Sequence, residues 1–216
     1  MLKIDLHTHS VASKDGGISV EQYKTCLKDK LLDYIAITDH DTIALAQQLN
    51  HDLGKQIIVG EEISTPEGDI IGLFLHKKVP ANLPILKAIE HIKDQNGLVY
   101  IPHPLESVRS AVSQSTLEVI AQDVDIVEVF NGRALIQNKA PKAAMWTRIN
   151  SKAEAASSDA HGISGLGKTY TIVNEAPTRS NLVQQLQTAK KTIQNPSFKD
   201  ILYPTINRFR KRLNIK

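Results

Sequence analysis

Short apolar segments alternate along this chain with stretches of helical periodicity, and this alternation most constrains its fold. Most of the apolar segments are four to six residues long and rich in β-branched side chains, which is typical of strands buried on both faces. They lie at residues 2–6, 34–38, 56–60, 70–74, 98–102, 126–130, 154–157 and 170–173. Strands that alternate with helices predict an α/β protein with a parallel sheet, either doubly wound or closed into a barrel.

The stretches between the strands carry local helix signals. Ser19 precedes VEQYKTCLKDK and is expected to cap a helix there. Ile85, Ile89 and Ile92 recur at helical spacing, and Gly97 suits the end of that helix. No repeat, low-complexity tract or linker interrupts the pattern, so residues 1–216 are predicted to form a single domain.

Composition excludes several classes of protein. Hydrophobic residues make up 41% of the chain and charged residues 23%, as in ordinary globular proteins. No apolar run approaches the roughly 20 residues that span a bilayer, and charge interrupts the N-terminus at once. The single cysteine, Cys26, excludes an intramolecular disulfide and lies in a predicted helix, where we expect it to pack. We therefore expect a cytoplasmic protein without a membrane partner.

The net charge of +3 is too small to indicate a nucleic-acid partner by itself. Much of the excess lies in the C-terminal stretch RFRKRLNIK. Such a run is usually the solvated face of a last helix, which we favour over attraction to phosphate.

Histidines and acidic residues gather where the predicted strands end. His7 and His9 follow the first strand two residues apart, so their side chains project to the same side. The others are Asp15 in the next loop, Asp39, His40 and Asp41 after the second strand, Glu61 and Glu62 after the third, His103 after the fifth, Glu128 and Asn131 at the end of the sixth, and Asp159 and His161 after the seventh. The carboxyl ends of parallel strands lie on one side of a sheet or barrel, so these side chains are predicted to converge there.

Ligand type and number indicate which metals such a site would hold. Imidazole mixed with carboxylate, without cysteine, suits Zn²⁺, Mn²⁺ or Fe²⁺ in a catalytic rather than a structural site. The candidates outnumber the ligands of one ion, so we predict two or three divalent metal ions per chain. One carboxylate must then bridge, and we assign that role to Glu62.

Each motif also has an ordinary structural interpretation. Asp41 suits a helix start, the prolines around His103 suit a rigid turn, and Glu62 could pair with a lysine. Asp159 and His161 could form a capping pair. Their joint position at strand ends favours the metal site.

The ordered motifs DLHTHS, SKDGG, ITDHDT, GEEIST, IPHP, EVFNGR and SSDAHG resemble the polymerase and histidinol phosphatase (PHP) family, in particular its short stand-alone members. The match covers most of the chain. The resemblance implies a distorted (β/α)7 barrel, similar to a TIM barrel, with a trinuclear metal centre at the C-terminal ends of the strands. It also implies a metal-dependent phosphoesterase.

The resemblance assigns nine metal ligands. His7, His9, Asp159 and bridging Glu62 match the ligands of the first metal, His103 and Glu62 those of the second, and Asp15, His40 and His161 those of the third. Relatives tend to have histidine where this chain has Asp69, so the second metal would gain an oxygen ligand. His76 is an alternative only if its loop bends back, and we favour Asp69. His51 and His91 match no motif and are expected to be solvated.

Phosphoester hydrolysis requires cations for the phosphate and an acid for the leaving oxygen. Arg109 and Arg133 are candidate phosphate ligands, because guanidinium groups match phosphate geometry, and pairing with a nearby acid is their alternative role. His161 and His40 are the candidate proton donors. Asn131 is expected to orient a ligand or substrate. Lys168, in a glycine-rich run that lacks phosphate-loop spacing, is a minor candidate for binding substrate charge.

Two other functional classes remain open. Amidohydrolase barrels also begin with a His-x-His pair, but they commonly carry a bridging lysine where this chain has Glu62. A non-catalytic metal-binding module is the second alternative, and the departure at Asp69 favours it slightly.

The expected substrate is a small phosphorylated metabolite or nucleotide, with a short oligonucleotide as a further possibility. Aromatic residues make up only 5% of the chain, and Phe130 and Tyr170 are the few expected near the site. Extended single strands usually stack on aromatic side chains, so the sequence does not indicate such a ligand. The segment 104–124 is expected to shape specificity.

Overall fold

A computed structural model describes residues 1–107, 109–134 and 139–213. The strands are β1 (Leu2–Asp5), β2 (Tyr34–Ile37), β3 (Ile57–Ile63), β4 (Ile70–Leu73), β5 (Leu98–Ile101), β6 (Ile126–Asn131), β7 (Ala153–Ser157), β8 (Tyr170–Val173) and β9 (Lys190–Thr192). The helices are α1 (Val20–Lys28), α2 (Ala44–Leu53), α3 (Ile85–Asp94), α4 (Gln114–Ile120), α5 (Ala140–Ile149), α6 (Leu182–Leu186) and α7 (Phe198–Arg212), with a 3-10 turn at Gly54–Gln56. Among these described helices, none is long and apolar enough to cross a membrane.

Over the described residues the strands form one sheet in the order β7-β6-β5-β4-β3-β2-β1-β8-β9. The chain beyond β1 pairs with the chain beyond β7, through a parallel bridge between Thr8 and Ala160. The backbone N–H of His9 donates to the carbonyl oxygen of Ala160 at 2.9 Å. This contact brings the sheet close to a closed ring and confirms the predicted α/β barrel.

The prediction of a regular alternation between parallel strands and helices is wrong at two places. β4 pairs antiparallel with both β3 and β5, and only a turn, without a helix, joins β3 to β4. β8 pairs antiparallel with β1 and lies outside the ring with β9. Apolar runs of this length give burial but not direction, so the sequence could not distinguish a reversed strand from a parallel one.

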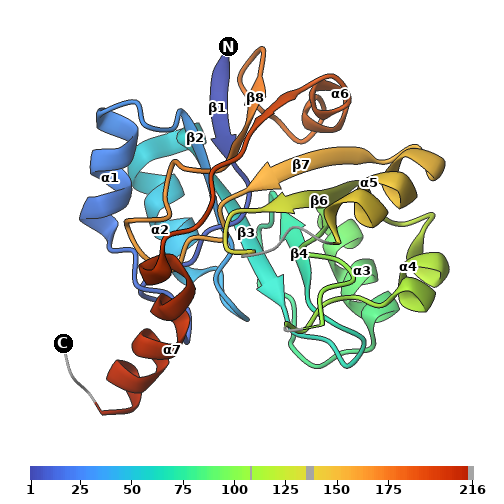
Figure 1. The fold of residues 1–216 in the computed structure, drawn as a ribbon, viewed down its shortest axis with the longest axis horizontal. Helices are drawn as coiled ribbons and strands as arrows, with labels where there is room; N and C mark the ends of the chain where they lie inside the picture. Colours follow the sequence, from blue (N-terminus) through green and yellow to red (C-terminus); the bar gives the residue numbers. More distant parts are fainter. Residues whose placement is uncertain (108, 135–138, 214–216) are drawn as a thin grey trace.

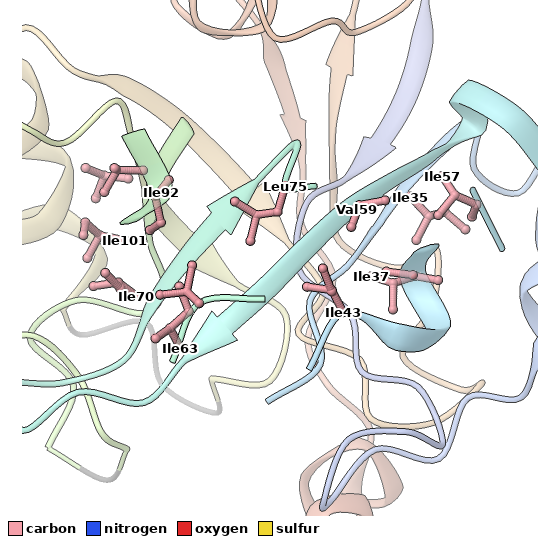
Figure 2. Close-up of a cluster of buried hydrophobic side chains, with 14 of the residues drawn as sticks. Ile35, Ile37, Ile43, Ile57, Val59, Ile63, Ile70, Leu75, Ile92 and Ile101 are labelled. Carbon is pink, nitrogen blue, oxygen red and sulfur yellow. The ribbon is translucent and has the colours of Figure 1, made fainter. Parts of the chain in front are cut away.

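Alternate residues of the strands supply two separate apolar cores. Ile35 and Ile37 of β2 pack in one core, together with residues of α2 and α3, while Ala36 between them packs in the other. Figure 2 shows isoleucines of β2 to β5 lying beside Ile43 and Ile92 of the helical layer. Both faces of the strands are therefore buried, as the apolar runs predicted.

The local signal at Ser19 placed the start of α1 accurately, whereas α3 ends at Asp94 and Asn96, not Gly97, takes the left-handed conformation after it. Ser19 caps α1 by accepting from the backbone N–H of Gln22, whose side chain accepts in return from the backbone N–H of Ser19. Cys26 packs in the core. In Figure 1, β1 runs from the N-terminus towards the end of the molecule at which α7 (red) lies.

Replacing Ile92 by alanine should lower the free energy of unfolding by about 2–5 kcal/mol, because its side chain is fully buried and truncation leaves a cavity. Urea unfolding followed by circular dichroism measures the change. The matched control is Ile149→Ala in α5, where the side chain is 74% exposed and the cost should be below about 1 kcal/mol. Equal losses in the two variants would contradict the assignment of Ile92 to the core.

Candidate metal centre

Four imidazole rings surround the carboxylate of Glu62 at one end of the barrel. Its Oε2 lies 3.3 Å from Nε2 of His7, 3.1 Å from Nε2 of His9 and 3.4 Å from Nε2 of His40. Its Oε1 lies 3.2 Å from Nε2 of His103. Glu62 is therefore placed where a carboxylate that bridges metal ions would lie.

The possible ligand atoms form four overlapping groups, in each of which they lie within 4.8 Å of one another. The groups are His7, His9 and Asp159; His7, Glu62 and His103; His40, Glu62 and Asp69; and His9, Asp15, His40 and His161. Together they contain all nine residues that the sequence nominated as ligands. Nitrogen and carboxylate donors at this density point to divalent metal ions.

Two rings of the cluster make a contact that a cation between them would explain. Nε2 of His7 and Nε2 of His9 lie 3.0 Å apart, with both rings fully buried. Two neutral acceptor nitrogens repel at this distance unless a proton or a metal ion lies between them. These residues therefore fit a metal ion.

The reversed direction of β4 explains the position of Asp69. Because β4 runs antiparallel to β3, its first residue pairs with the last residue of β3, Ile63. Asp69, just before β4, is therefore brought to Glu62, whereas His76 follows the other end of the strand and is exposed. The structure brings Asp69 into the cluster and leaves His76 outside it. His51 and His91 are exposed on α2 and α3.

Two of the clustered residues adopt a backbone conformation that side chains disfavour. His103 has a φ of 30° and Asp159 a φ of 50°. Each such residue costs on the order of 1–3 kcal/mol, and such strain is concentrated at functional sites. This backbone strain is consistent with a functional requirement that both side chains point into the cluster.

Glu128 of β6 orients two histidines from behind the cluster. Its Oε1 lies 3.1 Å from Nδ1 of His7 and accepts from the hydroxyl of Tyr100 at 2.9 Å. Its Oε2 accepts from the backbone N–H of His103 and from Nδ2 of Asn131, each at 2.8 Å. A carboxylate at Nδ1 fixes the imidazole tautomer that presents Nε2 to a metal. Asn131 therefore orients Glu128, in keeping with its expected orienting role.

Other acids at the strand ends serve the loops. Asp39 accepts from the backbone N–H of Ser10 at 2.6 Å, and Asp41 accepts from the backbone N–H of Ser64 at 2.9 Å. Glu61 accepts from the backbone N–H of Val79 at 2.7 Å. Adjacent residues of a strand project to opposite faces, so Glu61 points away from the cluster that Glu62 enters.

Burial and charge shift the pKa values of the cluster in both directions. Burial opposes charging of His9, but hydrogen bonds to Asp159 and Glu62 raise its pKa to about 9. Burial, with the nearby charge of Glu62, raises the pKa of Asp69 to about 8. Burial, with the charges of His9 and Arg133, lowers the pKa of His161 to about 3, which keeps that imidazole neutral and suited to ligation.

A cavity of about 350 Å³ opens over the cluster and is ringed by cations. Arg109 and Arg133 line it, together with Lys14 and Arg208. Nη1 of Arg109 lies 2.7 Å from Oδ2 of Asp159, and Nη1 of Arg133 lies 3.3 Å from the same atom. Burial opposes ionisation of Asp159, but Arg133, His7 and Arg109 hold its pKa well below its usual value. Both predicted phosphate ligands thus face the cavity while pairing with an acid.

Sequence reasoning missed the contribution of the C-terminal helix. Arg208 of α7 lines the cavity, 3.8 Å from Oδ2 of Asp15, although the sequence favoured a solvated face for its basic run. Spacing along one helix gives no information on which distant loop that helix contacts. Lys14 was missed in the same way. Lys168 pairs with Asp200 at 2.9 Å and does not line the cavity.

A larger groove of about 620 Å³ lies elsewhere, lined by residues such as Ile58, Phe74 and Arg179. Its described lining contains no carboxylate and its walls are mostly apolar. His51 and His76 also line it, but no group of three or more ligand residues among the described residues includes them, so the groove does not have the ligand set of a metal centre despite its size.

Comparison with known proteins gives two relatives above 30% identity and several more distant structures. The chain is 38% identical to the uncharacterized protein MJ1587 of Methanocaldococcus jannaschii over 143 residues, which cover 60% of this chain and 82% of that protein. A model of the PHP-associated family (PHP_C) matches residues 138–190. The chain belongs to the PHP-domain family.

Two solved structures share the fold at low sequence identity. One is a two-domain protein of Bacteroides vulgatus, described as containing a predicted PHP-like metal-dependent phosphoesterase. It has a TM-score of 0.71 and 20% identity, over 96% of this chain and 69% of that one. The other is the lesion-specific endonuclease Q of Pyrococcus furiosus, with a TM-score of 0.63 and 15% identity, over 88% of this chain and 57% of that one.

Replacing Glu62 by glutamine should weaken metal binding by at least about 100-fold. Even groups that only support ligands contribute about 10- to 100-fold to affinity, and Glu62 contacts four imidazoles directly. Elemental mass spectrometry and calorimetric titration measure the loss. The control is Glu61→Gln, the same substitution at the adjacent buried position. Equal metal affinity in the two variants would contradict the placement of Glu62.

Metal affinity should rise between about pH 6 and pH 9. His9, with a pKa of about 9, and Asp69, with a pKa of about 8, both hold protons at pH 7 that a bound ion must displace. Calorimetry at pH 7 in two buffers of different ionisation enthalpy should show net proton release, which declines above pH 9. Binding without proton release would show that these shifts are absent in solution.

Proposed function

We propose that this protein is a metal-dependent phosphoesterase, with residues 1–216 acting as one PHP domain. The observation that carries the proposal is the cluster of nine ligand residues directly beneath a cavity ringed by arginine and lysine. Carboxylates and imidazoles that hold divalent ions, beside cations that bind phosphate oxygens, are the requirements of phosphoester hydrolysis.

The proposed centre contains two or three ions of Zn, Mn or Fe. His7, His9, Asp159 and Glu62 would hold the first, His103, Glu62 and Asp69 the second, and Asp15, His40 and His161 the third. Ions bound there would activate a water molecule near neutral pH and offset phosphate charge. The four groups of ligand atoms support this assignment.

Arg109 and Arg133 would bind the non-bridging oxygens of the phosphate. Their side chains are 15% and 17% exposed and face the cavity, while their present partner Asp159 is a candidate ligand. Nη1 of each arginine reaches the site, and a substrate phosphate would compete with Asp159 for these donors.

Proton transfer to the leaving oxygen falls to the histidines that line the cavity. His161 and His40 both have a pKa lowered by burial, which favours neutral imidazole and hence ligation. The side chain of His40 is 11% exposed, against 2% for His161. We assign His161 chiefly to metal binding and keep His40 as the main candidate donor on its exposure alone, because solvent can reprotonate the more exposed ring.

The substrate would be a small phosphorylated metabolite or a nucleotide. The cavity of about 350 Å³ lies near the lower end of the usual range for small-molecule sites. A short oligonucleotide is the second candidate, favoured by the shared fold of the Pyrococcus endonuclease Q. The amide-hydrolase alternative is less well supported, because Glu62 occupies the position of the expected bridging lysine.

The purified protein should release product from an aryl phosphate, a bis-aryl phosphate diester or a member of a nucleotide panel, with added Mn²⁺ or Zn²⁺. A chelator should abolish turnover, and the preferred substrate would distinguish monoesterase from diesterase. Less than one ion per chain after reconstitution would overturn the proposal. Bound metal without turnover on this panel or on short oligonucleotides would favour the non-catalytic module.

Replacing Arg133 by methionine should lower kcat/KM by about 100-fold, because a charged donor to the phosphate is lost from a buried site. Steady-state kinetics with the best substrate of the panel measures the effect, and metal content should stay unchanged. Arg148→Met is the control, since Arg148 is 75% exposed on α5 and pairs with Glu154. An Arg133 variant with normal kinetics would remove this residue from the phosphate site.

A further inference from the structure

Asn207 of α7 links two loops that carry candidate metal ligands. Its Nδ2 donates to the backbone carbonyl oxygens of Asp15 and His161, each at 2.9 Å. The side chain is only 7% exposed, so these two bonds satisfy both donors of a buried amide. One side chain thereby fixes the spacing of two loops that are about 145 residues apart in sequence.

Lys211, one turn further along α7, holds the first of these loops. Its Nζ donates to the carbonyl oxygens of Val11 at 2.8 Å and Gly16 at 2.9 Å, and also to that of Ser13. The three donors of the ammonium group are therefore all used by the loop that presents Asp15. A solvated surface lysine does not make such contacts.

Two glycines allow the helix to approach this closely. A Cβ at Gly17 would lie 2.8 Å from Nδ2 of Asn207, and a Cβ at Gly162 would lie 2.5 Å from the ring of Tyr203. Each glycine lies next to one of the loops that α7 contacts. The backbone of both loops is thus shaped to receive α7.

The contacts of α7 select one group of ligands. Asp15 and His161 belong to the group that also contains His9 and His40. Within the described part of the chain, the hydrogen bonds and ion pairs of α7 reach the loops of Asp15 and His161 but not His7, Glu62 or His103. Those three come from β1, β3 and β5, and Glu128 orients His7 and His103.

We propose that Asn207 and Lys211 are positioning residues that build the third metal subsite, formed by Asp15, His40 and His161 with His9 beside them. A metal ligand functions only when it is held within roughly 0.5 Å of its productive place, and loop residues need external support for this. α7 gives this support directly to the loops of Asp15 and His161, whereas within the described residues it makes no hydrogen bond or ion pair with His7, Glu62 or His103. This inference rests on the proposed metal-dependent function of the site.

The test uses the full chain carrying Asn207→Leu or Lys211→Met, each of which removes the donors at similar side-chain size. Stepwise affinities for Zn²⁺ and Mn²⁺ are measured by calorimetry, and ions per chain by elemental mass spectrometry. We expect wild type to bind three ions. In each variant one ion should bind roughly 10- to 100-fold more weakly while the other two keep their affinity.

Two matched controls separate positioning from general stability. Arg212→Met removes an adjacent, exposed cation of the same helix and should bind metal as wild type does. Lys211→Arg keeps a charged donor group and should restore most of the lost affinity. Thermal unfolding of every variant is recorded. If Asn207→Leu does not fold, Lys211→Met alone carries the test, because Lys211 is an exposed residue whose replacement should be tolerated.

Three outcomes overturn the inference. Unchanged stepwise affinities in Lys211→Met, even with a lower melting temperature, would show that α7 has a structural role only. A wild-type protein that binds only two ions would remove the subsite while the proposed phosphoesterase function still stands. A wild-type protein that binds no ion would overturn the function and the inference together.

Discussion

The carboxylate of Glu62 among four buried imidazoles is the interaction on which the site depends. A buried carboxylate is costly unless cations or hydrogen-bond donors compensate it, and here His7, His9, His40 and His103 lie within 3.4 Å of its oxygens. Burial opposes its ionisation, yet His40 and His7 hold its pKa well below the usual value. The four imidazole rings lie in the segments that follow β1, β2 and β5. The barrel must therefore assemble before the charge of Glu62 is compensated.

The apolar cores of the barrel make such a concentration of polar groups tolerable. Both faces of β2, β3 and β5 are buried by alternating aliphatic side chains, which fixes the ends of these strands within a rigid frame. Polar side chains are then confined to one end, where Glu128, Asn131 and Tyr100 supply hydrogen bonds from behind. Strained backbone at His103 and Asp159 is sustained because the surrounding structure overdetermines it.

The geometry of the candidate metal centre is consistent with membership of the PHP family. Carboxylates and imidazoles beneath the cavity would hold metal ions, and the arginines around it would hold phosphate. α7 adds a cationic wall through Arg208 and a support for the loops through Asn207 and Lys211. In Figure 1 this helix lies apart from the helices that cover the strands, as its role at the site rather than in the core would suggest.

The sequence by itself determined the α/β class, and its resemblance to the PHP family selected the barrel and nominated the nine candidate ligands. Strand-length apolar runs, caps such as Ser19 and ordered motifs at strand ends are local signals, and local signals can be read without coordinates. Tertiary structure decided what depends on direction and distance. β4 runs antiparallel to β3, which places Asp69 rather than His76 beside Glu62. The docking of α7 brings Asn207, Arg208 and Lys211 to loops that are far away in sequence. Strand direction and the docking of a terminal helix are set by long-range packing and hydrogen bonding, on which the periodicity of a single segment carries no information.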